Sequence, residues 1–172
     1  MVCVFAAFVI WRTRTKTQQF GPYLIEAKGD GVFVCQRLEI YLIDPAATSP
    51  KLYLGTCGTP SFITDSAHLS DAHSCFAVSD DRTAMIYFHL PHWCGGSAQA
   101  AAKHGGVYLH DARKKDDRLL YDDSHVTQVW GGSAGPSPGI KVGWISAEPH
   151  KGVTSQNSDF WISIDGTETP IW

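Results

Sequence analysis

The stretch Gly106-Val107-Tyr108-Leu109-His110-Asp111 has the pattern of a short apolar β-strand that ends in Asp, and similar stretches occur twice more in the chain. The two counterparts are Glu39-Ile40-Tyr41-Leu42-Ile43-Asp44 and Phe160-Trp161-Ile162-Ser163-Ile164-Asp165. Each of the three is followed by a second short apolar segment, at residues 51–54, 118–121 and 169–172. We call these three stretches the recurring phrase; a sequence pattern that recurs at this scale indicates stacked supersecondary units. We therefore take the recurring phrase as the third strand of a repeated unit and the segment after it as the fourth.

The first two strands of each unit are expected ahead of the phrase. They are predicted at residues 61–70 and 75–81 in the second unit and at 126–130 and 140–146 in the third. The first unit has one such segment, at residues 2–12, and nothing ahead of it. The sequence thus predicts an all-β fold of about three four-stranded antiparallel blades of a β-propeller, an incomplete ring. The expected divisions are a partial blade at 1–56 and blades at 57–122 and 123–172.

Composition supports this class and limits the partners. The chain has 172 residues, of which 44% are hydrophobic and 18% charged, and its 16 Gly and 9 Pro separate short apolar runs, as in an all-β domain. A formal net charge of -3 offers no basic surface for a phosphate backbone, so nucleic acid is excluded as a partner. The apolar start, residues 1–11, is too short to span a bilayer and is predicted to be a buried strand, with an uncleaved membrane anchor as the alternative. Five Cys without a C-x-x-C pair indicate neither a redox motif nor a zinc ribbon, and buried apolar thiols are expected.

A family resemblance rests on one long stretch. His68-Leu69-Ser70-Asp71-Ala72-His73-Ser74-Cys75-Phe76-Ala77-Val78-Ser79-Asp80-Asp81, followed later by the phrase at 106–111, resembles the TolB-type propeller repeat. The resemblance implies a ring with more blades than this chain supplies, completed by another chain or a second copy, and an extracellular or periplasmic location. One departure is that Asp71-Ala72-His73 stands where the repeat has Pro-Asp-Gly, a turn whose Gly takes a positive φ at little cost.

The longest connections are expected between second and third strands, at residues 13–37, 82–104 and 147–158. Connections of this length are commonly functional, and all three are predicted on one face. In the second of them, His89, His92 and His104 are candidate metal ligands, with Cys94 close by, and their nitrogen and sulfur donors suit Zn or Mn. Aspartate pairs at 80–81 and 122–123 have the oxygen donors that Ca²⁺ prefers. The alternative is a surface loop whose imidazoles form ordinary hydrogen bonds.

The nearest enzyme resemblance is to oligogalacturonate lyases, in which channel-facing His and Gln hold a divalent metal and Arg and His act on a uronate. By that resemblance His125 and Arg82 are candidate catalytic residues and Gln128 is a candidate ligand-binding residue. Exposed tryptophans suit both sugar stacking and protein contacts, and the candidates are Trp93, Trp130 and Trp144. A structural role for each of these side chains is the alternative. No G-x-S-x-G motif occurs, which excludes a peptidase of the related type.

Two functions of different class are compatible with these features. The first is a non-catalytic propeller module that binds a protein or glycan partner through the face that carries the long connections. The second is a metal-assisted carbohydrate-active enzyme, similar to a polysaccharide lyase, or a fragment of one. We favour the first because the Gln-His-His set of the lyases is incomplete and the turn motif departs from the repeat.

Overall fold

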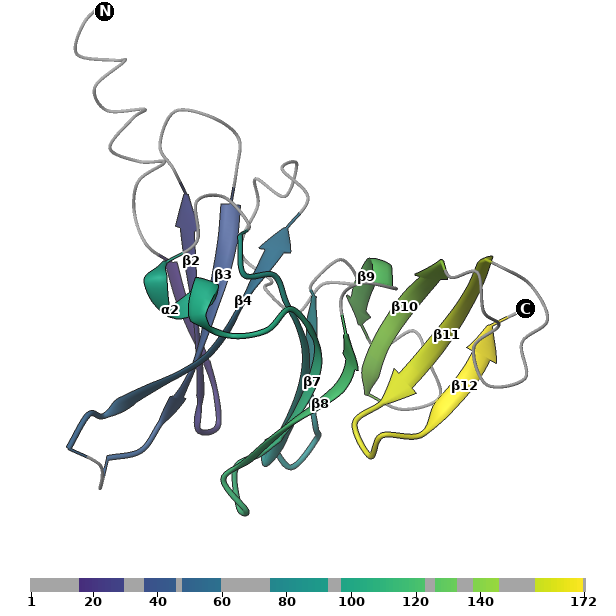
Figure 1. Cartoon of the computed structure of the whole chain (residues 1–172). Coiled ribbons are helices and arrows are strands. Elements are labelled where there is room, and N and C mark those ends of the chain that lie inside the picture. The colour runs from purple at the N-terminus through teal and green to yellow at the C-terminus, as the bar shows by residue number, and fades with distance from the viewer. Residues whose placement is uncertain are drawn as a thin grey trace, which may run out of the picture.

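The structure is a computed structural model of the chain, and it describes residues 16–29, 36–45, 48–59, 75–92, 97–122, 126–132, 138–145 and 157–171. Within these residues twelve strands form three four-stranded antiparallel sheets, and in each sheet the strands are neighbours in chain order. The three sheets lie in an open row and do not close into a ring (Figure 1). The predicted number of sheets is therefore confirmed, and so are the four strands predicted for the second and third.

The strands have the following bounds. Sheet 1 consists of β1 (Lys16–Phe20), β2 (Tyr23–Gly29), β3 (Gln36–Ile43) and β4 (Lys51–Thr59). Sheet 2 consists of β5 (Phe76–Val78), β6 (Ala84–His89), β7 (Gly106–Asp111) and β8 (Asp116–Asp122). Sheet 3 consists of β9 (Val126–Gly132), β10 (Gly139–Ile145), β11 (Asn157–Ser163) and β12 (Glu168–Ile171). One short helix, α2 (Ala98–Ala102), lies between β6 and β7.

The recurring phrase forms β3, β7 and β11, the third strand of each sheet, as predicted. Its side chains do not all point the same way. Tyr108 stacks on Tyr87 and faces sheet 1, and Tyr41 occupies the corresponding side of sheet 1. Ile162 faces sheet 2, so its neighbour Trp161 faces the opposite side of sheet 3. Trp161 thus lies on a third strand like the two tyrosines but faces the other way, because its terminal Asp is one residue further away and a one-residue offset reverses the face.

Sheet 1 has four strands, not the three predicted. Both β1 and β2 lie inside residues 13–37, which were expected to be a connection; the expected strand at 2–12 is outside the described residues. The segment Lys16–Phe20 escapes prediction because it is polar, with Thr17, Gln18 and Gln19 at its centre. Its hairpin to β2 has Gly21 at a positive φ of 58, as a two-residue turn with Gly in first position requires. The expected division at 56/57 falls within β4.

Sheet 2 also begins later than predicted. Its first strand is β5, at the place expected for the second, and the expected strand at 61–70 is outside the described residues. The second strand is β6, which lies inside the predicted connection 82–104. Residues 85–89 are all buried, so β6 lacks the alternation of polar and apolar side chains that marks a half-exposed strand.

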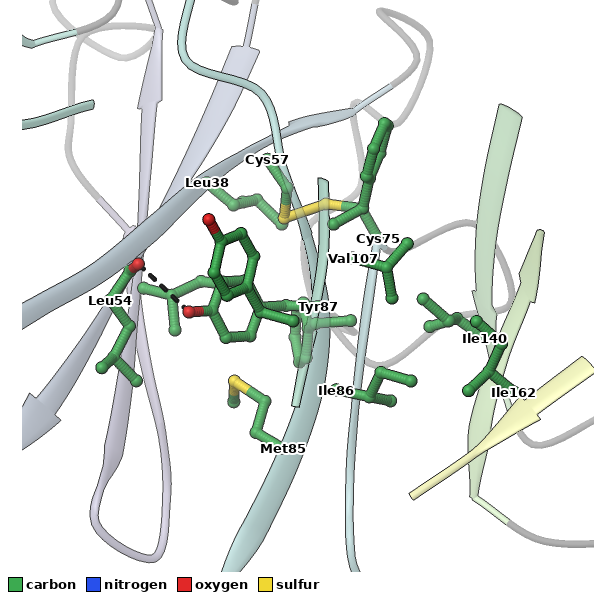
Figure 2. Close-up of a cluster of buried hydrophobic side chains, with 14 of the residues drawn as sticks. Leu38, Leu54, Cys57, Cys75, Met85, Ile86, Tyr87, Val107, Ile140 and Ile162 are labelled. Carbon is green, nitrogen blue, oxygen red and sulfur yellow. Dashed lines mark hydrogen bonds between the residues drawn. A yellow bond between two sulfur atoms is a disulfide. The ribbon is translucent and has the colours of Figure 1, made fainter. Parts of the chain in front are cut away.

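Sheet 2 lies between the other two, and β6 supplies the core on both of its sides. Met85 and Tyr87 point toward sheet 1, whereas Ile86 points toward Ile140 and Ile162 of sheet 3 (Figure 2). All five side chains are fully buried. The apolar cores on the two sides of sheet 2 therefore hold the row together.

Candidate functional site

The two ends of the row differ in the length of their connections. The stretches that join second to third strands, and one sheet to the next, leave from one end, at 30–35, 60–75, 90–105, 123–125 and 146–156. The turns at the other end are shorter than the three longest of these; the longest of them spans 44–50. We call the former the loop-rich end; it is uppermost in Figure 1. The structure describes residues 90–92 and 97–105 of it, which include α2.

His89 is a buried side chain near this end, and both of its ring nitrogens form hydrogen bonds. Its Nε2 lies 3.1 Å from the carbonyl oxygen of Ala100, and its Nδ1 lies 2.9 Å from the backbone nitrogen of Thr56 in β4. We therefore assign Nε2–H as the donor to Ala100, while Nδ1 accepts from the Thr56 N–H. The side chain of Ser97 caps α2 and fixes the Ala100 carbonyl in place. Because burial lowers the pKa of His89, the ring is neutral, and it serves to join β4, β6 and α2.

Lys103, directly after α2, makes a second junction between sheets 1 and 2. Its Nζ donates to the carbonyl oxygen of Leu54, 2.5 Å away, and to the hydroxyl of Tyr87, 2.6 Å away. It also forms an ion pair with Asp117 and lies 3.9 Å from the ring centroid of Tyr108. Burial lowers the pKa of Lys103, and the Asp117 carboxylate opposes that effect. The three N–H donors of the ammonium group are thus used in bonds to the Leu54 carbonyl, the Tyr87 hydroxyl and the Asp117 carboxylate.

Two further contacts tie the same sheets together. Cys57 at the end of β4 forms a disulfide with Cys75 just before β5 (Figure 2), so two of the five Cys are paired rather than free thiols. The Tyr23 hydroxyl donates to the Thr83 carbonyl at 3.0 Å and lies 3.1 Å from Nδ1 of His110. Burial raises the pKa of Tyr23 and lowers the pKa of His110, so both groups are neutral near pH 7. The junction of sheets 1 and 2 is accordingly rich in polar and covalent links.

The structure does not bring the three candidate metal ligands together. His89 is buried with both ring nitrogens in hydrogen bonds, whereas His92 and His104 are exposed, and His104 lies 3.4 Å from Asp122. Among the described residues no group of three or more His, Cys, Asp or Glu side chains is arranged to hold a metal ion. Cys94 lies outside the described residues. The metal site therefore stays a prediction without a ligand group in the described part of the chain.

Of the two candidate catalytic residues, the structure describes Arg82. Arg82 lies in the turn between β5 and β6, at the end opposite the loop-rich end, and not in the predicted connection between second and third strands. It is exposed, has a positive φ of 58, and its Cβ is 2.8 Å from where a Cβ on Gly21 would lie. Its place against the first hairpin indicates a contact between turns. His125 lies outside the described residues.

The candidate ligand-binding residues are placed only by the backbone. In sheet 3 Gln128 is the register partner of Gly143, Trp130 that of Lys141, and Trp144 that of Val126. Trp93 lies outside the described residues. The predicted roles of these four residues remain untested.

Sequence analysis missed a charged network on the side of sheet 1 that faces away from sheet 2. Glu39 accepts from Nε of Arg37 at 3.1 Å and from the hydroxyl of Tyr41 at 2.5 Å, and it contacts Nζ of Lys28. Burial alone would raise the pKa of Glu39, but these three hydrogen bonds outweigh it and lower the pKa. Burial and the nearby carboxylate raise the pKa of Tyr41 to about 12. The signal for this network was the alternation Arg37-x-Glu39-x-Tyr41 within the recurring phrase and its flank.

The same network includes a second carboxylate, Glu26, which is the register partner of Glu39. Glu26 contacts Nζ of Lys51 and lies 3.6 Å from Nζ of Lys28, which thus bridges the two carboxylates. Lys51 extends over the ring of Tyr41, 4.8 Å from its centroid. Five charged side chains from three strands therefore form one continuous set.

In the part of the chain that the structure describes, no helix is long and apolar enough to cross a membrane. Comparison with known proteins gives no relative: no family model matches the chain, and no curated protein or solved structure matches it either.

Proposed function

We propose that the protein is a non-catalytic binding module, that its three sheets are the blades of an incomplete β-propeller of the TolB type, and that it binds a protein or glycan partner at the loop-rich end. The supporting observation is the difference between the two ends, since the stretches at 60–75, 90–105 and 146–156 all leave from one of them. Binding residues are commonly carried by long connections on a rigid scaffold.

The sheets that carry this end are joined by the disulfide and by the hydrogen bonds of His89 and Lys103. His89, which is buried, and Lys103, which is partly buried, use their polar atoms in bonds to backbone and side-chain partners. A general base or nucleophile needs an atom within reach of a substrate. These two groups are therefore better suited to holding the loop-rich end in place than to chemistry.

A glycan array probed with the full chain in the presence of EDTA tests the proposal. We expect metal-independent binding that is lost in Trp93→Ala and retained in Lys114→Ala, whose side chain lies in the turn at the opposite end. Binding of an uncharged glycan that survives Trp93→Ala and Trp144→Ala would contradict a loop-end site. Binding that requires a divalent metal and is lost in His92→Ala would instead favour the metal-assisted carbohydrate-active alternative.

A further inference from the structure

The three sheets stack with one polarity, and the first of them has an unusual outer side. The sides of sheets 2 and 3 that face the preceding sheet are buried in the core, as Tyr87 and Ile162 illustrate. The corresponding side of sheet 1 carries the charged network, and we call it the cationic face; it consists of Glu26, Lys28, Arg37, Glu39 and Lys51. Terminal units of stacked repeats have a polar outer side. Burying these charges beneath another sheet would cost several kcal/mol for each ion, so this side is unsuited to closing a ring.

On this face the lysine side chains are more exposed than the carboxylates with which they pair. The side chains of Glu39 and Glu26 are 3% and 12% exposed, whereas those of Lys28 and Lys51 are 32% and 42% exposed. A ligand that approaches the face therefore meets ammonium groups first. Three cations against two carboxylates leave one positive charge in the set.

The cations are also held in fixed positions. Lys28 lies between two carboxylates, and Lys51 is held by Glu26 and by the ring of Tyr41. Fixing a flexible side chain before a ligand arrives reduces the entropy lost on binding.

We propose that the cationic face binds the sulfate groups of a sulfated polysaccharide. Compact ammonium groups pair with anions as point charges, and those of Lys28 and Lys51 are the more exposed charges of this face. The disulfide between Cys57 and Cys75 indicates an oxidising compartment, where sulfated glycans are common ligands. The chain as a whole carries a formal charge of -3 and repels a polyanion, so binding must be local to this face.

The experiment measures binding of a size-defined heparin oligosaccharide to the full chain by calorimetry at low ionic strength. We expect Lys51→Met to weaken the affinity by about tenfold, which is the effect of losing about 1.4 kcal/mol, and Lys51→Arg to retain it. Lys114→Met removes the same charge from a turn outside the face and should leave the affinity unchanged. Added salt should weaken binding to the wild type more than to Lys51→Met, because one ion pair fewer is screened.

Four results would overturn the proposal: no binding of heparin at low ionic strength, an equal loss in Lys51→Met and Lys114→Met, equally tight binding of desulfated heparin, or equally tight binding of polyglutamate. The last would assign the face to an acidic peptide. The site is separate from the loop-rich end, so Trp93→Ala should leave heparin affinity unchanged. Failure here and failure of the proposed function are thereby distinguished.

Discussion

Removing the disulfide between sheets 1 and 2 should destabilise the protein by an amount that follows from its loop. Cys57 and Cys75 are separated by 18 positions, and both lie in the core. In the chain-entropy description, a bridge that closes a loop of this length limits the unfolded chain and stabilises the native state by about 3 kcal/mol. We therefore expect Cys57→Ala/Cys75→Ala to lower the free energy of unfolding by about 3 kcal/mol.

Urea unfolding followed by circular dichroism measures this change. With a slope of about 2 kcal/mol per molar, which is typical of small domains, the midpoint should fall by about 1.5 M. Reductant should shift the wild type by a similar amount and leave the double variant unmoved, which serves as the matched control. Trypsin cleaves after Lys51 and Arg82 and not between them, so one peptide contains both cysteines and reports the bridge by its mass. A double variant with the wild-type midpoint, in a protein whose peptide shows the bridge, would refute the reasoning.

Three further predictions concern the same junction. Burial lowers the pKa values of His89 and His110 below their usual 6.5, so the unfolded state binds more protons than the folded state as the pH falls. The melting temperature should therefore be highest above about pH 6.5 and should fall as the pH drops through the folded-state pKa values. A melting temperature that stays constant between pH 7.5 and 5.5 would contradict this. Gly55→Ala places a Cβ 2.7 Å from Cε2 of the buried Tyr87 ring, so an overpacking cost of about 1–3 kcal/mol should appear in urea unfolding, and an unchanged midpoint would show that the ring can move. Lys103→Met keeps the packing but removes the ammonium group, and we expect a loss of about 2 kcal/mol in the same assay, with equal or greater stability as the contrary result.

The strands that could be predicted from sequence are short apolar runs that lie between turn residues. The phrase that forms β3, β7 and β11 has such a pattern, and so do β9, β10 and β12. Three strands, β1, β2 and β6, lie inside residues that were predicted to be connections, and β1 and β6 were missed for opposite reasons. The polar Lys16–Phe20 has too little apolar character to mark an edge strand, and Ala84–His89 is apolar throughout because both its sides are buried.

The contacts between sheets could not be predicted, because each joins residues that are far apart in the chain. Lys103 meets the Leu54 carbonyl, and Tyr23 meets His110, only after both sheets have formed. His89 shows the limit most clearly. Its spacing to His92 suggested metal ligands, yet a backbone N–H from another sheet occupies its Nδ1. Spacing along the chain does not show which hydrogen-bonding partners from other parts of the chain a side chain will contact in the folded protein.

The distribution of buried polar groups indicates how an open row of sheets keeps its arrangement. Apolar sides such as those of Ile86 and Ile140 attract one another in many relative positions, because the hydrophobic effect is non-directional. Among the described residues, sheet 1 packs against sheet 2, and its other side is charged. Hydrogen bonds are directional, and those of His89 and Lys103 are satisfied in one placement of sheet 1 against sheet 2. Shifting the sheets would leave these groups buried without partners, a larger penalty than the lost apolar contact, so the polar junction selects the arrangement that orients both the loop-rich end and the cationic face.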